Sequence, residues 1–318
     1  MTLEEELKGI AKAVDLRINE LLSTVDDILL EPSKFAVEAR GKKIRPAILV
    51  LACMATGGDA ENALPYAASI ELVHTASLII DDIIDSGSLR RGVSSLHERF
   101  GLNAAMLTGV ILSSKAFNVL SRNPSISQTV TEAICDMTEG EALDSTSSVF
   151  NCVEEDYFRV VSKKTASLFS CAAKVGGLIG MASKDDLVSL SRYGHHVGIA
   201  FQIHDDILGL TSSEGTLRKS VGADLKSGKI NLPLLHAVTS ISPQDRYELR
   251  NFLSDISPDK EKLREVLELL RRTGSVEYSR RKAEESVQKS KKHLHTLDSS
   301  KARDMLEGLA DYIIARTN

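Results

Sequence analysis

The stretch LIIDDIIDSGSLRRG, which runs from Leu78 to Gly92, sets Asp81, Asp82 and Asp85 among leucine and isoleucine side chains. A buried carboxylate is costly unless a partner offsets its charge. On a helix, Asp81 and Asp85 lie one turn apart on one face, with Asp82 about 100° around the axis. Mg²⁺ prefers such oxygen ligands and completes its coordination with phosphate oxygens and water. The spacing therefore predicts a metal site that faces a phosphorylated ligand.

A second acidic pair, Asp205 and Asp206 in FQIHDDILGL, has similar apolar flanks. Gln202 lies one helical turn before Asp205, and Gly209 stands where a third carboxylate would repeat the first pattern. A solvated acidic face would have more polar flanks, and each pair is followed at once by a segment rich in basic residues. Two such clusters favour metal binding over an ordinary charged surface.

Basic side chains gather where an anion could bind. Lys42, Lys43 and Arg45 precede or open a predicted helix, and helix N-termini favour anions. Singly, each cation is more often a surface charge, but together they suit a diphosphate, because guanidinium groups fork onto phosphate oxygens and lysines act as point charges. The other members of this set are Arg90, Arg91, Lys163, Lys164 (with Thr165), Lys219 and Lys229.

Helical periodicity dominates the chain, and convincing strand alternation is absent. No linker or strong repeat divides the sequence, so we predict one all-α domain over 1–318 with about ten or more helices. Several prolines are placed at predicted helix starts or links, Pro32 and Pro65 among them. Helices are predicted over 3–22, 46–56, 63–85, 102–121, 127–143, 154–180, 184–211, 230–239, 243–254, 259–273, 275–296 and 299–316.

Composition excludes several classes of protein. A net charge of −5 argues against nucleic acid as a partner. No apolar run approaches the ~20 residues of a membrane span, and the acidic N-terminus resembles neither a signal nor a transit peptide. The four cysteines are scattered, which indicates reduced thiols and a cytoplasmic protein. Glu71 and His74 match one half of a di-iron motif, but no second copy follows.

Four ordered motifs resemble those of the trans-isoprenyl diphosphate synthases, or polyprenyl synthetases, over nearly the whole chain. They are GKKIRP, ELVHTASLIIDDIIDSGSLRRG, KKT, and FQIHDDILGL followed by KSVGADLKSGKINLPL. The resemblance implies a bundle of long helices around a central cavity (the isoprenoid synthase fold), usually as a homodimer. It also implies a prenyltransferase that uses Mg²⁺, with Mn²⁺ as a substitute, to condense isopentenyl diphosphate with an allylic diphosphate.

The same resemblance implies roles for individual residues. Asp81, Asp82 and Asp85 would hold Mg²⁺ on the allylic diphosphate, and Asp205 would hold a further ion. The allylic diphosphate would be bound by Arg90, Lys164, Thr165, Gln202, Lys219 and Lys229, and isopentenyl diphosphate by Lys42, Arg45, His74 and Arg91. The expected catalytic set is Asp81, Asp82, Asp85, Arg90, Lys164 and Asp205. Three positions depart from the family pattern, namely Arg40, Val110 and Gly209.

Small side chains near the first acidic cluster bear on product length. Ala76 and Ser77 lie about one turn before Asp81, and Val73 lies a turn further away. Relatives that make short products often carry a bulky aromatic residue there. The resemblance thus implies a product of geranylgeranyl length or longer, with the geranylfarnesyl-to-hexaprenyl range favoured and Phe117 as a candidate floor.

Two alternatives remain at this point. A class I terpene cyclase also ionises a diphosphate with Mg²⁺, but it needs one diphosphate site rather than two. A non-catalytic subunit of a heteromeric prenyl synthase is the other alternative, although such a subunit could lose its aspartates freely.

Overall fold

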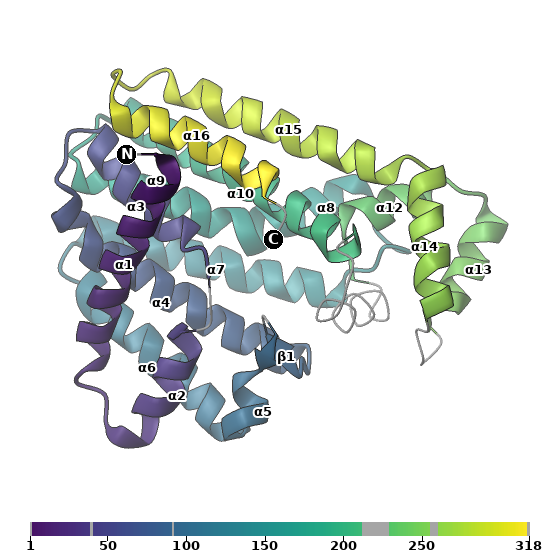
Figure 1. Ribbon diagram of the computed structural model, residues 1–318, viewed down its shortest axis with the longest axis horizontal. Helices are drawn as coiled ribbons and strands as arrows, with labels where there is room; N and C mark the ends of the chain where they lie inside the picture. The colour runs from purple at the N-terminus through teal and green to yellow at the C-terminus, as the bar shows by residue number, and fades with distance from the viewer. Residues whose placement is uncertain (1, 39–40, 91, 212–228, 255–259, 317–318) are drawn as a thin grey trace. The chain divides into compact units, whose positions relative to one another are not determined.

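The computed structural model describes residues 2–38, 41–90, 92–211, 229–254 and 260–316 (Figure 1). The described chain is helical almost throughout, so the predicted all-α class is confirmed. One antiparallel pair of very short strands interrupts it. The first elements are α1 (Leu3–Leu22), α2 (Asp27–Glu38), α3 (Ile44–Ala55), α4 (Ala60–Ile84), β1 (Leu89–Arg90), β2 (Val93–Ser94), α5 (Leu96–Phe100), α6 (Leu102–Leu120) and α7 (Pro124–Thr146).

The second half of the chain begins with a run of helix that was predicted as one element. It consists of α8 (Glu154–Val161), the π-helical turn η1 (Ser162–Ala166) and α9 (Ser167–Ile179). The remaining helices are α10 (Lys184–Thr211), α12 (Leu232–Thr239), α13 (Pro243–Ser254), α14 (Lys260–Arg272), α15 (Ser275–Leu294) and α16 (Lys301–Ala315). Most helix boundaries fall within a few residues of the predicted ones.

The chain divides into two compact units, each assembled from separate stretches of sequence. The first unit comprises Met1–Ile134, Leu168–Gly194 and Lys291–Leu309, and the second comprises Cys135–Ser167, His195–Ser290 and Ala310–Asn318. No single point in the sequence separates the two. The single domain over 1–318 stays a prediction.

In the first unit, α4 packs against α6, α3 and α1 (Figure 1). Asp59 caps the start of α4, because its Oδ1 accepts a hydrogen bond from the backbone N–H of Glu61 at 3.1 Å. Apolar side chains occupy most of the circumference of α4, and many of its residues are buried. The helix that carries the first acidic cluster is therefore a core helix.

By length and composition alone, α4 could cross a membrane, which the sequence analysis did not expect. However, 67% of its most apolar window is buried inside the protein. A mostly buried helix of this kind is typical of a protein core, and its length and composition are weak evidence for a membrane span.

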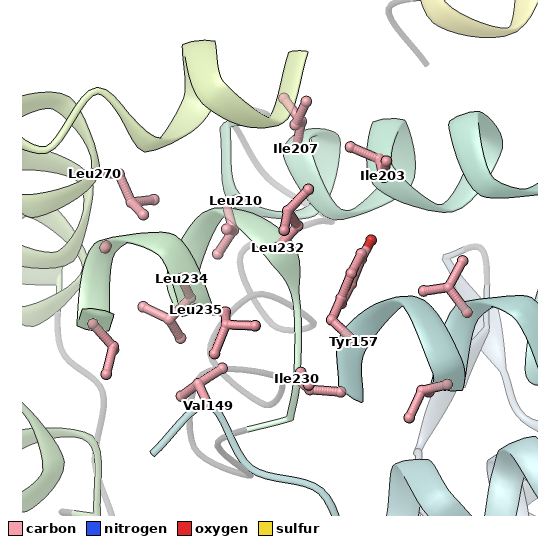
Figure 2. Close-up of a cluster of buried hydrophobic side chains, with 14 of the residues drawn as sticks. Val149, Tyr157, Ile203, Ile207, Leu210, Ile230, Leu232, Leu234, Leu235 and Leu270 are labelled. Atoms are coloured by element: carbon pink, nitrogen blue, oxygen red, sulfur yellow. The ribbon is translucent and has the colours of Figure 1, made fainter. Parts of the chain in front are cut away.

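The core of the second unit gathers side chains from α8, α10, α12 and α14 (Figure 2). Tyr157 of α8 lies among aliphatic residues, and Figure 2 shows its hydroxyl oxygen directed toward α10. Helix α12 packs against both α8 and α14. The side chains labelled in the figure are Val149, Tyr157, Ile203, Ile207, Leu210, Ile230, Leu232, Leu234, Leu235 and Leu270.

The sequence analysis missed α2, α5 and the strand pair. It also misplaced Pro32 and Pro65, which lie inside α2 and α4 rather than at helix starts or links. A proline removes the hydrogen bond to the carbonyl four residues earlier. Those carbonyls belong to Ile28, which is 80% exposed, and to Glu61, which is also exposed. Water can therefore replace the missing bond, and both helices continue.

Candidate active site

The first acidic cluster ends α4. Asp85 is the C-cap, and Ser86 follows it with a left-handed φ of 50°. The backbone N–H of Gly87 donates to the carbonyl of Asp82 at 2.9 Å, and that of Ser86 donates to Ile83 at 3.2 Å. This pattern is a Schellman motif. Because a helix C-terminus carries partial negative charge, the carboxylates and the helix dipole both favour a cation here.

The strand pair brings the chain back to the first acidic cluster and places Arg90 beside Asp81 and Asp82. Residues Arg90 and Val93 face each other in the antiparallel register. The Nε of Arg90 donates to both carboxylate oxygens of Asp82 at 2.9 and 3.0 Å, and its Nη2 lies 2.6 Å from Asp82 Oδ1 and 3.0 Å from Asp81 Oδ2. The guanidinium of Arg90 thus bridges two predicted metal ligands.

The three aspartates differ in their surroundings. Asp82 is buried, and burial raises its pKa although Arg90 opposes the shift. Asp81 is half-buried, whereas Asp85 is exposed at the end of the helix. Asp85 is therefore the most exposed of the three side chains and Asp82 the least, while Oδ1 of Asp81 is itself buried.

The oxygen donors of the first cluster fit a divalent metal that is shared with a ligand. Among the described residues, no three His, Cys, Asp or Glu side chains converge as a preformed metal site. Mg²⁺ does not require such a cage, since it is usually held by one or two carboxylates together with substrate phosphates and water. Hard carboxylate oxygens at the negative end of a helix, bridged by an arginine, fit that mode of binding.

Two predicted ligands of isopentenyl diphosphate meet in the first unit. Nη1 of Arg45 lies 3.0 Å from Nε2 of His74. A guanidinium only donates, so Nε2 of the neutral imidazole must accept and Nδ1 must carry the proton. The Arg45 guanidinium also lies 4.4 Å from the centroid of the Phe169 ring. Because Arg45 is in the first turn of α3, the site combines a cation with a helix N-terminus.

The other predicted members of that set are less defined by the structure. Lys42 is exposed just before α3, and Arg91 lies outside the described residues. The neighbouring Lys43 is instead buried and forms an ion pair with Asp15 at 2.7 Å. The role of Lys42 as a ligand of isopentenyl diphosphate stays a prediction.

The KKT motif forms the π-helical turn η1. Such turns are rare and occur often at functional sites. Gly140 of α7 lies against this turn, since a Cβ there would fall 2.2 Å from the backbone nitrogen of Lys164 and 2.6 Å from its Cα. Only glycine allows this approach, so α7 fixes the place of Lys164 and Thr165.

Carboxylates of α7 hold the two lysines of the turn. Lys164 Nζ lies 2.7 Å from Glu141 and 2.6 Å from Asp144. Lys163 Nζ lies 2.9 Å from Asp136 and 2.5 Å from Glu139. The sequence analysis did not identify these partners, because two lysines give no indication of which distant carboxylates they meet.

Thr165 and Gln202, which are both predicted to bind the allylic diphosphate, are joined by a hydrogen bond. Thr165 Oγ1 donates to Gln202 Oε1 at 2.8 Å, and Gln202 Nε2 donates to Asp206 Oδ1 at 2.9 Å. Asp206 Oδ2 accepts from the hydroxyl of Tyr157 at 2.7 Å and from the backbone N–H of Leu232 at 3.3 Å. Burial raises the pKa of Asp206 to about 7, against the effect of these bonds.

Asp205, the predicted metal ligand of the second cluster, is paired with Arg316 near the C-terminus. The Arg316 side chain is 8% exposed and its guanidinium lies 4.1 Å from the centroid of the Phe201 ring. His204 Nε2 lies 2.8 Å from the backbone oxygen of Arg316. As at the first cluster, an arginine contacts a predicted metal ligand, and no sequence pattern pointed to Arg316.

The segment after the second cluster is described only at its end. Lys219 lies outside the described residues, and Lys229 is half-buried just before α12. Among the described residues, a Cβ at Gly209 would meet no atom within 4 Å beyond its chain neighbours and its own helix backbone.

The predicted chain-length residues lie on two helices that pack together, α4 and α6. Val73 and Ala76 are buried, while Ser77 is half-buried and its hydroxyl donates to the carbonyl of His74 at 2.8 Å. Phe117 is half-buried on α6. Their effect on product length stays a prediction.

Comparison with known proteins bears on the identity of this site. The model of the polyprenyl synthetase family matches residues 26–270. A short chain isoprenyl diphosphate synthase from Methanothermobacter thermautotrophicus is 38% identical over 325 residues, which cover 99% of both chains.

Solved structures are equally similar over their length. Geranylgeranyl pyrophosphate synthetase from Pyrococcus horikoshii has a TM-score of 0.89 and 36% identity, covering 99% of this chain and 98% of that one. A polyprenyl synthase from Caulobacter crescentus, complexed with calcium and isoprenyl diphosphate, has a TM-score of 0.91 and 28% identity over 99% and 98% of the two chains. The predicted isoprenoid synthase fold is thereby confirmed.

The motifs, the fold and these relatives agree, and the family is generally dependent on a divalent metal. This chain belongs to the polyprenyl synthetase family and is a trans-prenyltransferase that condenses isopentenyl diphosphate with an allylic diphosphate.

Proposed function

We propose that this enzyme uses Mg²⁺ to extend an allylic diphosphate to a product of geranylgeranyl length or longer. The observation that carries the metal part is the bridge of Arg90 across Asp81 and Asp82 at the negative end of α4. The bridge marks a place where cationic charge is stabilised. Asp81, Asp82 and Asp85 would hold Mg²⁺ there, and Asp205 would hold a further ion.

The metal, when bound, supplies a Lewis acid that stabilises charge on the leaving diphosphate. Arg90, Lys164 and Lys229 would add positive charge to the same diphosphate, and Thr165 and Gln202 would add hydrogen bonds. Lys219 and Arg91, although outside the described residues, complete the proposed sets. Lys164 would have to share its ammonium group between Glu141, Asp144 and the diphosphate.

Arg45 and His74, with Lys42, would bind isopentenyl diphosphate. Their contact at the N-terminus of α3 supports a second diphosphate site, which a synthase needs and a class I cyclase does not. The aspartates of both clusters remain in place, which argues against a non-catalytic subunit. The relatives are likewise diphosphate synthases by name.

The relatives are named for products of different length, so their names do not fix the length of this product. The proposed length rests instead on the residues one turn before Asp81. Ala76 and Ser77 have small side chains, and Phe117 on α6 would act as a deeper floor. Replacing Ala76 with Phe is expected to shift the products toward shorter chains, separated by reversed-phase chromatography. An unchanged distribution would remove this part of the proposal.

We also propose a cytoplasmic homodimer. Leu102, Met106 and Val110 are exposed at steps of one helical turn along α6, and an apolar stripe of this kind suits a second copy of the chain. Light scattering of the purified protein would test it. A monomer at micromolar concentration would contradict the proposal.

The function is tested by incubating the purified chain with labelled isopentenyl diphosphate and farnesyl diphosphate, with Mg²⁺ or with chelator. We expect label in a longer allylic diphosphate only when Mg²⁺ is present. A cyclic hydrocarbon without label, or equal turnover in chelator, would overturn the proposal.

A further inference from the structure

Thr165 and Gln202 are held by a chain of hydrogen bonds that begins in the core of the second unit. The chain runs from the hydroxyl of Tyr157 to Asp206 (2.7 Å), from Gln202 to Asp206 (2.9 Å) and from Thr165 to Gln202 (2.8 Å). Tyr157 is 1% exposed and lies among aliphatic side chains (Figure 2). No motif identified from the sequence contains it.

The two oxygens of Asp206 have distinct partners. Oδ2 accepts from Tyr157 and from the first backbone N–H of α12, and Oδ1 accepts from Gln202. A carboxylate held on one side by a stiff tyrosine cannot turn freely, so the oxygen offered to Gln202 is fixed. Burial also raises the pKa of Tyr157 well above its usual value, so the phenol keeps its proton and remains a donor.

The fixed carboxylate sets the orientation of the Gln202 amide. Its Nε2 donates to Asp206 Oδ1, and its Oε1 therefore faces Thr165 and accepts the hydrogen bond of the threonine hydroxyl. The amide nitrogen of Gln202 carries two N–H donors, and one of them donates to Asp206. The second remains for an anion, as suits a residue predicted to contact a diphosphate.

We infer that Tyr157 is a positioning residue for the allylic diphosphate, which acts through Asp206 to hold Gln202 and Thr165 in place before the substrate binds. The inference rests on the proposed role of Thr165 and Gln202 in diphosphate binding. It assigns to Asp206 a role different from that of its neighbour Asp205, namely orienting a protein amide instead of holding a metal. Ordering these side chains in advance reduces the entropy that substrate binding must overcome.

The chain offers a matched control for Tyr157. Tyr193 in the first unit is also fully buried, and its hydroxyl donates a bond of the same length, 2.7 Å, to the backbone carbonyl of Leu306. Tyr157→Phe and Tyr193→Phe each remove one buried hydroxyl. Comparable losses of stability are expected, and thermal denaturation will measure them.

The kinetic constants distinguish the two variants. Tyr157→Phe is expected to raise KM for farnesyl diphosphate by about five- to tenfold, the effect of roughly one hydrogen bond, with KM for isopentenyl diphosphate unchanged. Tyr193→Phe should leave both constants as in the parent. If Tyr157→Phe behaves like Tyr193→Phe, or raises both constants equally, the inference is wrong.

Combining Tyr157→Phe with Thr165→Val tests the route of the effect. If Tyr157 acts through Thr165, its substitution will cost much less in the Thr165→Val background than in the parent. Full additivity of the two changes would contradict the inference. The cycle is measured below the melting temperatures of all variants, so that a less stable Tyr157→Phe protein still gives an answer.

The same experiment separates the inference from the proposed function. If Thr165→Val alone leaves KM for farnesyl diphosphate unchanged, the proposed diphosphate site fails. If Thr165→Val raises that KM but Tyr157→Phe does not, the site stands and only the role of Tyr157 is rejected.

Discussion

The two acidic clusters differ in how the protein manages their charge. At the end of α4, one arginine spans Asp81 and Asp82, and both oxygens of Asp82 are occupied by it. On α10, the partners are divided, because Arg316 pairs with Asp205 while Tyr157 and Gln202 satisfy Asp206. An Asp-Asp pair therefore does not by itself identify two metal ligands.

The comparison also separates the two arginines. Arg90 lies five residues after Asp85 in the basic segment that follows the cluster in the sequence, and the strand pair, which was not predicted, brings it back to the aspartates. Arg316 belongs to the C-terminal end of the chain and packs on the ring of Phe201. We therefore propose that Arg90 binds substrate and that Arg316 serves as a counter-charge for Asp205.

The largest expected effects come from two of the predicted metal ligands, one in each acidic cluster. Asp81→Ala should lower kcat/KM for condensation by about a thousandfold, or ~4 kcal/mol of transition-state stabilisation. Asp205→Ala should cost less, about a hundredfold, because it removes a single ligand of one ion. Steady-state kinetics at saturating Mg²⁺ will measure both. Equal activity of either variant and the parent would contradict the metal assignment.

The Asp81→Ala substitution could lower activity by loosening the first unit, and the buried thiols of that unit provide a control for this effect. Burial raises the pKa of Cys53 to about 11 and that of Cys171 to about 12, so little thiolate exists at neutral pH. Their alkylation should therefore be slow, whereas Cys135 is exposed to the reagent. If Cys53 is labelled faster in Asp81→Ala than in the parent protein, the lost activity reflects a loosened first unit and not the loss of a metal ligand.

A smaller effect distinguishes the two arginines. Arg90→Met should raise KM for the allylic diphosphate by about tenfold or more, because it removes a proposed phosphate contact. Arg316→Met removes the counter-charge of Asp205 together with the contact of the guanidinium on Phe201, so it should lower the Mg²⁺ concentration needed for half-maximal activity by about two- to threefold. Similar effects of both changes on the allylic KM would erase the distinction.

The smallest effect concerns Gly209, where the second cluster lacks a third carboxylate. In the part of the chain that the structure describes, no atom beyond the neighbouring residues and the helix's own backbone lies within 4 Å of where a Cβ would stand at this glycine, so these residues leave room for an aspartate. Gly209→Asp should lower the half-maximal Mg²⁺ concentration by about twofold, and Gly209→Asn, of the same size without charge, should not. Magnesium titrations of activity will compare the two. A rise in the Mg²⁺ requirement with Asp would oppose a metal at this cluster.

Sequence reasoning could reach features that depend on near neighbours in the chain. The spacing of Asp81, Asp82 and Asp85 on one helix, and the basic residues that follow, are visible as a local pattern. The helices followed from apolar periodicity, apart from short α5 and α2 with its internal Pro32. The exposed carbonyl that the proline leaves unbonded explains why α2 tolerates it.

The rest depended on contacts between distant parts of the chain. Tyr157 meets Asp206 across 49 residues, and Arg316 meets Asp205 across 111. The approach of Gly140 to Lys164 likewise joins α7 to the π-helical turn. No local pattern encodes such pairs, because they are fixed by packing of helices and not by periodicity.

The proposed mechanism depends above all on divalent ions through which the acidic clusters bind the allylic diphosphate. Isothermal titration with an unreactive thio analogue of farnesyl diphosphate examines this binding without turnover. We predict tight binding by the parent in Mg²⁺, and a loss of about a hundredfold or more both in chelator and in Asp81→Ala. Affinity that is unchanged by chelator and by the substitution would contradict the mechanism.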